Sequence, residues 1–146
     1  RRQSAGLVDY LVAWQDDHLA GHVLLNWTGS GDEAVRSQLK VRCPDVEDLF
    51  VLPQLRGSGI GTQFLAEVER RAAEKGYAWI GLSVGVDDNP AARRLYERLG
   101  YRDAGLGEYV EQGEYTDAEG MRQTWEEICL YLVKNIRELD PGPIGN

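Results

Sequence analysis

The stretch VEDLFVLPQLRGSGIGTQFLAEVERR, Val46 to Arg71, joins two apolar patterns through a cluster of glycines. The run Val46–Leu52 is rich in residues that favour strands, and Pro53, which cannot donate a backbone hydrogen bond, predicts its end. A helix is predicted over Gly59–Lys75 because apolar residues recur there at every fourth position, namely Ile60, Phe64, Val68 and Ala72. The glycines therefore lie at a strand-to-helix corner.

Glycines at such a corner favour a phosphate ligand. The first N–H groups of a helix have no partner inside it and carry the positive end of its dipole, and Gly57, Gly59 and Gly61 leave them accessible. Arg56 adds a positive charge beside them. The pattern is neither a Walker loop, because no lysine precedes Thr62, nor a dinucleotide fingerprint, because it reads GxGxG. A turn that only lets strand and helix pack closely remains the alternative.

The remaining chain alternates strands with helices. Leu7–Trp14 and His22–Trp27 are predicted to form a hairpin around Asp16-Asp17, followed by a flexible loop from Thr28 that includes TGSGDEAVRSQ. YAWIGLSV is predicted to be a buried strand. A second helix is predicted from Pro90, with Asn89 as its N-cap and Gly100 at its end.

After this helix, Tyr101 is predicted to begin a short strand. Glu108 to Glu119 is predicted to be an acidic loop, and TWEEICLYLVKNI the final strand. This order predicts an α/β (α+β) fold with a mixed sheet. One domain is expected over residues 1–140, with 141–146 as a loose tail.

Composition excludes several classes of function. A formal net charge of −8 argues against a nucleic-acid partner, and no apolar run is long enough to span a membrane. The two cysteines form no metal-binding spacing, and the two histidines, both near the hairpin turn, argue against a zinc site or a Ser-His-Asp triad. No metal is therefore expected, and reduced cysteines favour a cytoplasmic setting.

The motifs together resemble the GNAT superfamily of N-acetyltransferases. RGSGIG matches that family's Q/R-x-x-G-x-G/A motif, with Arg56, Gly59 and Gly61 in its defined positions, and Asn89 precedes Tyr96 as the family's second motif requires. The resemblance spans roughly Leu7 to Val133. It implies a mostly antiparallel, twisted sheet, flanked by helices and splayed at its central strands. The strand and helices that open the family's fold have no counterpart in this sequence, so a form short at its N-terminus is expected.

The resemblance implies that acetyl-CoA is the co-substrate. Its pyrophosphate is expected on the glycine corner and its pantetheine arm along the preceding strand, with Asn89 and Ala92 on the other side. The residues implied to bind it are Leu49, Phe50, Val51, Arg56, Gly57, Ser58, Gly59, Ile60, Gly61, Thr62, Asn89 and Ala92. The arginines of the second helix either reach its phosphates or form a solvated face.

Two side chains are candidates for the chemistry. An amine must lose a proton before it attacks, and Glu47 is the predicted base, on a strand face that alternation assigns to Leu49 and Val51 as well. Asp48, water, or a purely structural role for Glu47 remain alternatives. Tyr96 matches the family's tyrosine that protonates the leaving thiolate, although its helical spacing also fits a core residue. The implied reaction is direct attack in a ternary complex.

The sequence leaves several amine acceptors open. The acidic loop, with its glutamates and aspartates, suggests a small cationic amine, although a solvated acidic surface is the simpler interpretation. Peptide N-termini, lysine side chains and aminoglycosides also remain open, and a homodimer is possible because it is common in the family. The alternative function is a non-catalytic acyl-CoA-binding or sensor domain on the same fold.

Overall fold

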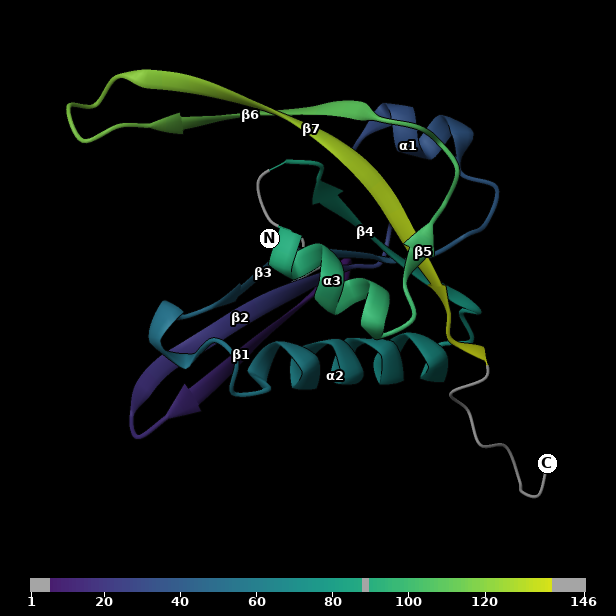
Figure 1. Cartoon of the computed structure of the whole chain (residues 1–146), viewed down its shortest axis with the longest axis horizontal. Helices are drawn as coiled ribbons and strands as arrows, with labels where there is room; N and C mark the ends of the chain where they lie inside the picture. The colour runs from purple at the N-terminus through teal and green to yellow at the C-terminus, as the bar shows by residue number, and fades with distance from the viewer. Residues whose placement is uncertain (1–5, 88–89, 138–146) are drawn as a thin grey trace.

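The computed structural model describes residues 6–87 and 90–137 (Figure 1). Its strands are Val8–Gln15 (β1), His18–Asn26 (β2), Asp45–Val51 (β3), Trp79–Gly85 (β4), Arg102–Asp103 (β5), Tyr109–Thr116 (β6) and Arg122–Asn135 (β7). Its helices are Glu33–Gln38 (α1), the 3-10 turn Pro53–Leu55 (η1), Ile60–Glu74 (α2) and Pro90–Arg98 (α3). The predicted cap Asn89 and the predicted tail 141–146 lie outside the described residues.

The strands form one mixed sheet in the order β1-β2-β3-β4-β7-β5, and β6 also pairs with β7. Only β3 and β4 run parallel; the other neighbours are antiparallel. The predicted α/β fold with a mixed sheet is confirmed. The opening hairpin is confirmed too, with a tighter turn than predicted, because Asp16 and Asp17 adopt φ angles of 51° and 70° and β2 already begins at His18.

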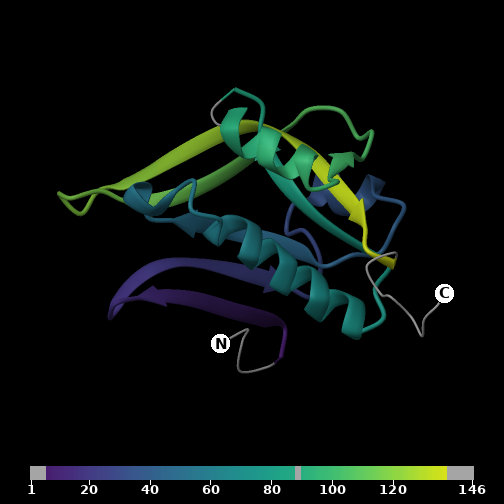
Figure 2. The same ribbon diagram turned by 60° about the horizontal axis from the view of Figure 1, so that its bottom comes forward.

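The sheet opens between its two central strands. β3 and β4 pair only at Asp45–Gly81 and Val46–Leu82, after which the strands separate (Figure 2). The C-terminal part of β3, Glu47 to Val51, therefore has a neighbour on the β2 side and an open edge on the other. This is the splayed centre that the sequence predicted.

A β-bulge lies in the same part of β3. Leu24 of β2 pairs with Glu47 and His22 pairs with Phe50, so one residue of β2 faces two of β3. Asp48, in the bulge, has a φ angle of 54°. The strict alternation predicted for this strand is therefore wrong. Because paired residues point to the same face, the bulge places Glu47 on the face of Phe50 rather than on that of Val51.

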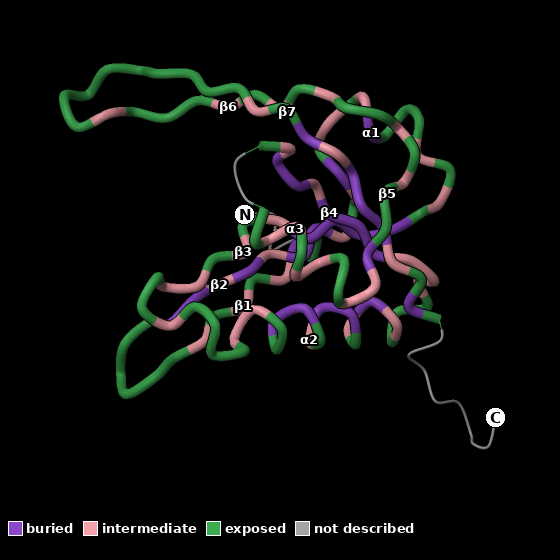
Figure 3. The backbone as a smooth tube through the Cα atoms, viewed as in Figure 1, coloured by how far each residue is buried: buried purple, intermediate pink, exposed green. Residues whose placement is uncertain are grey.

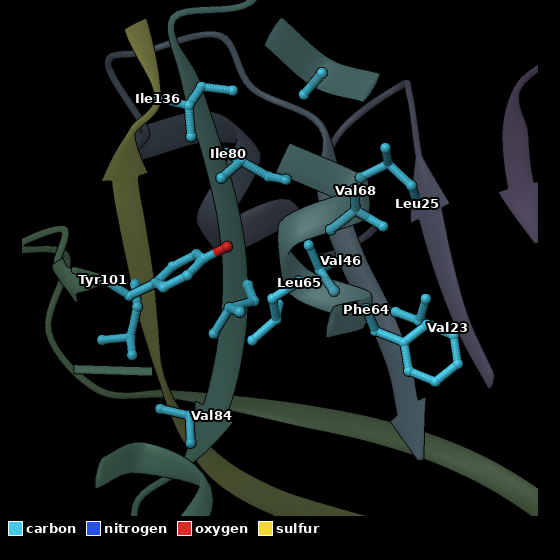
Figure 4. Close-up of a cluster of buried hydrophobic side chains, with 13 residues drawn as sticks. Val23, Leu25, Val46, Phe64, Leu65, Val68, Ile80, Val84, Tyr101 and Ile136 are labelled. Carbon is cyan, nitrogen blue, oxygen red and sulfur yellow. The ribbon is translucent and has the colours of Figure 1, made fainter. Parts of the chain in front are cut away.

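Helix α2 covers one face of the sheet and builds the main core (Figure 4). Its repeat of apolar residues is buried as predicted, except that Ile60 is only half-buried, and the cluster includes Val23 and Leu25 of β2 and Ile80 of β4. Gly76, with a φ angle of 91°, follows the end of the helix as predicted. The apolar residues of α3 pack against the same cluster, so both helices lie on this face.

The predicted loop from Thr28 is wrong, because part of it forms α1. Asp32 caps this helix, its carboxylate accepting a hydrogen bond from the Ala34 amide at 2.8 Å. Val35 is fully buried against Tyr131 and Val133 on the sheet face opposite α2. One buried apolar residue in six is too weak a signal to predict a helix; the cap and the neighbouring strand stabilise it.

The predicted acidic loop from Glu108 is also wrong. Most of it is β6, which pairs with β7 over its full length from Tyr109–Cys129 to Thr116–Arg122. The resulting hairpin extends away from the body, and its outer part is exposed (Figures 1 and 3). Acidic residues disfavour strands in isolation, but here the backbone pairing with a long neighbouring strand decides the conformation. Within the described residues, no helix has the length and apolarity needed to cross a membrane.

Candidate functional site

The glycine corner between β3 and α2 has a backbone conformation that glycine adopts readily. Gly57 and Gly59 have φ angles of 85° and 93°. A Cβ atom at either position would meet no heavy atom within 4 Å, so the space above both residues is open. The first hydrogen bond along α2 runs from the Gln63 amide to the Gly59 carbonyl, at 3.0 Å. The amides of the residues just before Gln63 come ahead of this first helical bond and so face the end of the helix. The corner therefore offers N–H groups at the positive end of a helix, which suits a phosphate.

The corner lines a cavity of about 490 Å³, here called the glycine cavity. It collects most of the residues predicted for the coenzyme, and Tyr96 with them: Leu49, Phe50, Val51, Arg56, Gly57, Gly59, Ile60, Gly61, Thr62 and Ala92. Ser58 does not belong to this lining, and its hydroxyl donates to the Leu55 carbonyl. Asn89 lies outside the described residues, so its predicted contact stays a prediction.

Arg56 lies at the end of β3. Its Nε donates a hydrogen bond to the Val51 carbonyl at 2.9 Å, and its guanidinium carbon lies 5.8 Å from the centre of the Phe50 ring. The side chain therefore closes the end of the open strand edge and brings a positive charge next to the glycine corner.

Helix α3 contributes residues to the glycine cavity that sequence reasoning did not assign to it. Leu55 of η1 and three residues of α3, namely Ala91, Leu95 and Arg98, line it. The α3 residues follow the spacing i, i+4, i+7, a signal that was available in the sequence. This separates the helix arginines: Arg98 lines the cavity, whereas Arg93 pairs with Glu97 at 3.0 Å.

A second cavity of about 460 Å³ adjoins the first, and we call it the acidic cavity. Its carboxylates are Asp32, Asp45, Glu47, Asp48 and Glu111. None of the described residues that line it is a lysine or an arginine. Leu49 and Tyr96 line both cavities, so the two spaces meet at these side chains. Such a strongly negative enclosure attracts a cation.

Tyr96 stands at the junction of the two cavities. Burial raises the pKa of its hydroxyl, which is therefore protonated at neutral pH. Its ring packs edge-on against Tyr101, with centroids 6.1 Å apart. Among the hydrogen bonds of the described residues, none involves the Tyr96 hydroxyl. A protonated donor thus lies where the contents of both cavities come together.

Glu47 is held at the wall of the acidic cavity. Its carboxylate accepts a hydrogen bond from Asn26 Nδ2 at 3.1 Å. The Oδ1 of Asn26 accepts from the Thr28 amide at 3.0 Å and from the Thr28 hydroxyl at 2.7 Å, which fixes the orientation of the amide. Glu47 is half-buried, whereas the neighbouring Asp48 is exposed. The predicted base is therefore the better ordered of the two acids.

Asp45 belongs to the same wall, and sequence reasoning missed it. Only 7% of its surface is exposed, and its Oδ1 accepts a hydrogen bond from the Tyr131 hydroxyl at 2.6 Å. Burial, and then its hydrogen bond with Glu47, raise the pKa of Asp45 well above its usual range. An acid that begins a strand looks solvent-exposed in a sequence; only the packing of β7 and α1 around it shows otherwise.

The cysteines are both buried free thiols, as expected. Burial raises the pKa of each to about 12, which makes them poor nucleophiles. Cys129 lies with Glu111 and Glu127 in a group whose ligand-type atoms are within 4.8 Å of one another. Acidic groups of this kind are common without an ion, and the absence of a metal stays a prediction.

Comparison with known proteins supports the resemblance. Residues 2–101 match the family model described as the acetyltransferase (GNAT) family. A thialysine N-epsilon-acetyltransferase from Mus musculus is 43% identical over 58 residues, which are 40% of this chain and 34% of that protein. An uncharacterized N-acetyltransferase from Methanocaldococcus jannaschii is 36% identical over 59 residues, 40% of this chain and 26% of that protein. The matches thus span about a third of these relatives or less.

Solved structures share the fold. A nourseothricin acetyltransferase superimposes with a TM-score of 0.62 at 25% identity, covering 90% of this chain and 67% of the other. An N-acetyltransferase from Thermoplasma acidophilum in complex with coenzyme A gives a TM-score of 0.60 at 18% identity, covering 92% and 65%. The second likeness shows the fold alone.

Proposed function

We propose that this chain, which belongs to the GNAT family of acetyltransferases, transfers the acetyl group of acetyl-CoA to a primary amine. The observation that supports this most directly is the meeting of two unlike cavities at Tyr96 and Leu49. One cavity ends in a corner suited to phosphate, and the other carries carboxylates suited to an amine. A thioester from the first and an amine from the second would meet at their junction.

The residues of the glycine cavity fit acetyl-CoA. The amides around Gly57 and Gly59 would bind the pyrophosphate, because their φ angles and the open space above them form a cradle that any Cβ would fill. Arg56 and Arg98, which both line the glycine cavity, add positive charge. The open edge of β3 would pair with the peptide-like pantetheine arm, as a strand pairs with a sheet edge. When bound, the coenzyme supplies an acetyl thioester.

Glu47 would act as the base for the amine. An alkylammonium ion loses one proton to the Glu47 carboxylate, and its nitrogen then forms a bond to the acetyl carbon while the carbon–sulfur bond breaks. Tyr96 would give its proton to the departing sulfur. The amine nitrogen loses its second N–H proton after the attack, and Tyr96 would regain a proton from solvent. A backbone N–H near Val51 would stabilise the negative oxygen that develops.

The acceptor would be a small cationic amine. The five carboxylates of the acidic cavity support this, as does the partial likeness to thialysine N-epsilon-acetyltransferases. Three of these carboxylates come from β3, one from the cap of α1 and one from β6. The sequence had predicted the segments of α1 and β6 to be loops. Self-association and a cytoplasmic location stay predictions.

An acceptor screen with a glycine variant tests the proposal. Release of CoA thiol from acetyl-CoA is followed with a panel that contains a diamine, a lysine-containing peptide, a peptide with a free N-terminus and an aminoglycoside. We expect release with at least one amine, fastest with the diamine. In Gly59→Glu, release should stop and acetyl-CoA binding should be lost, because bulk and negative charge enter the cradle.

Gly120→Glu is the matched control. Gly120 has a φ angle of 83° and, like Gly59, open space around its Cβ position, but it lies in the β6–β7 turn. It therefore carries the same backbone strain and charge away from both cavities. Equal loss of binding in both variants would contradict the assigned cradle. Coenzyme binding without thiol release for any amine would support the non-catalytic alternative.

A further inference from the structure

The wall of the acidic cavity contains two neighbouring carboxyl groups. Asp45 and Glu47 lie two positions apart on β3, leave the strand on the same face and both line this cavity. After burial itself, Glu47 is the main cause that raises the pKa of Asp45. Tyr131 donates to the outer side of the pair at 2.6 Å and Asn26 to the inner side at 3.1 Å. Tyr131 reaches Asp45 by lying across Gly81, where any Cβ would clash with its ring. Two donors therefore hold the pair, one from each neighbouring part of the sheet.

The surroundings of the pair are neutral or negative. Each packed element contributes titratable or polar groups that face it: Asn26 from β2, Asp32 and Cys43 from the segments flanking α1, Asp48 from β3, Ser83 from β4, Tyr96 from α3, Tyr109 and Glu111 from β6, and Tyr131 from β7. Glu111 raises the pKa of Asp45 further. No lysine or arginine among the described lining residues offsets these charges.

We infer that Asp45 is a positioning residue for the amine-deprotonating base: it shares a proton with Glu47, so that the two carboxyls accept a proton as one unit. This inference rests on the proposed function of Glu47 and deepens it. A buried and a half-buried carboxylate that lie side by side repel each other, and one proton between them relieves that repulsion. The pair therefore has a higher proton affinity than a single carboxylate.

The proton balance follows from the pair. The doubly ionised pair holds the ammonium form of the acceptor, takes one proton from it, and becomes singly protonated with that proton between the two carboxyls. The freed amine then attacks the thioester. After the product leaves, the pair loses the proton to solvent, and the cycle starts again. A stronger base suits this step because alkylammonium ions give up their protons reluctantly.

The pH dependence of kcat/KM in Asp45→Asn tests the inference. A pair that already holds a proton cannot take another from the amine, so the wild type loses kcat/KM as pH falls through the pKa of the pair. In Asp45→Asn the repulsion is gone, and we expect this acid limb to move to lower pH by about one unit or more. The same amine is used for the wild type and the variant, so that the ionisation of the amine itself affects both pH profiles equally. A limb that stays in place, with kcat/KM only scaled down, would show a merely structural role.

Tyr131→Phe should shift the limb in the opposite direction. Its hydroxyl stabilises the ionised form of Asp45, so its removal leaves the pair more ready to keep a proton. We expect the acid limb to move to higher pH in this variant. If both variants shift the limb in the same direction, the shared proton is excluded. Because Phe keeps the ring over Gly81, this variant also serves if Asp45→Asn does not fold.

Carboxyl titration by ¹³C NMR on the full chain without ligands separates this inference from the proposed function. We expect one Asp or Glu signal to titrate well above the usual range in the wild type and to be lost in Asp45→Asn. If no amine is acetylated but this signal is present, the proposed function fails and the shared proton stands. If every carboxyl titrates in the usual range, the inference is wrong whatever the activity.

Discussion

At the scale of single residues, the proposed role of Tyr96 as proton donor can be tested by removing its hydroxyl. Tyr96→Phe keeps the ring that packs against Tyr101 and removes only the proposed proton donor. We expect kcat to fall about 100-fold or more, because the leaving thiolate loses its acid. The dissociation constant of acetyl-CoA, measured by calorimetry, should stay unchanged. Tyr115→Phe, at the exposed hairpin, is the control; full turnover in Tyr96→Phe would remove this residue from the mechanism.

Some residues of the site can be recognised from the sequence around them, whereas others take their position from distant segments of the chain. Glycines with positive φ at a strand-to-helix corner are recognisable in a sequence, because the conformation itself demands them. The face of the sheet on which Glu47 lies cannot be recognised in the same way, because the bulge at Asp48 depends on how β2 and β3 pair. Asp45 was missed for a related reason: its burial depends on Tyr131, which is distant in the chain.

At the scale of elements, α2 contains a buried acid, Glu69, that joins it to β7. Glu69 is 5% exposed; it accepts a hydrogen bond from the Tyr101 hydroxyl at 2.7 Å and pairs with Lys134 at 3.0 Å. We expect Glu69→Gln to lower the free energy of unfolding by about 3 kcal/mol, because it leaves the charge of Lys134 without its buried partner. Urea denaturation measures this.

Glu67→Gln is the control for that prediction. Glu67 lies on the same helix and pairs with Arg70 and Arg71 near solvent, where such pairs contribute about 1 kcal/mol or less. We expect it to change stability far less than Glu69→Gln. If the free energy of unfolding fell by similar amounts in the two variants, the buried pair of Glu69 with Lys134 would contribute no more to stability than the surface pairs of Glu67.

Elements were predictable where their pattern was strong. The long repeat of α2 buries one side against the core, and the apolar runs of β3, β4 and β7 mark them as strands that contribute residues to the core. The short α1 and the acidic β6 were predicted as loops. Each owes its conformation to a contact from elsewhere: Val35 packs on Tyr131, and β6 pairs with β7 along its whole length.

At the scale of the whole molecule, ligand binding should be visible as added stability. A ligand that binds only the folded state, at 100 times its dissociation constant, adds about 2.7 kcal/mol. For a chain of this size, we expect acetyl-CoA to raise the melting temperature by roughly 5 °C or more. Gly59→Glu should show no rise. A wild type that melts at the same temperature with and without the coenzyme would contradict the assigned cavity.

What the sequence determined by itself was the strand, glycine corner and helix, the second helix with Tyr96, and through them the family. Those features are local: φ preferences, helical spacing and motif order act between residues close in the chain. The tertiary structure alone decided that a bulge turns Glu47 to the face of Phe50, that Tyr96 lies between two cavities, and that Asp45 lies beside Glu47 and Tyr131. These depend on contacts between distant segments, whose geometry is set by packing and strand register rather than by any single stretch of residues.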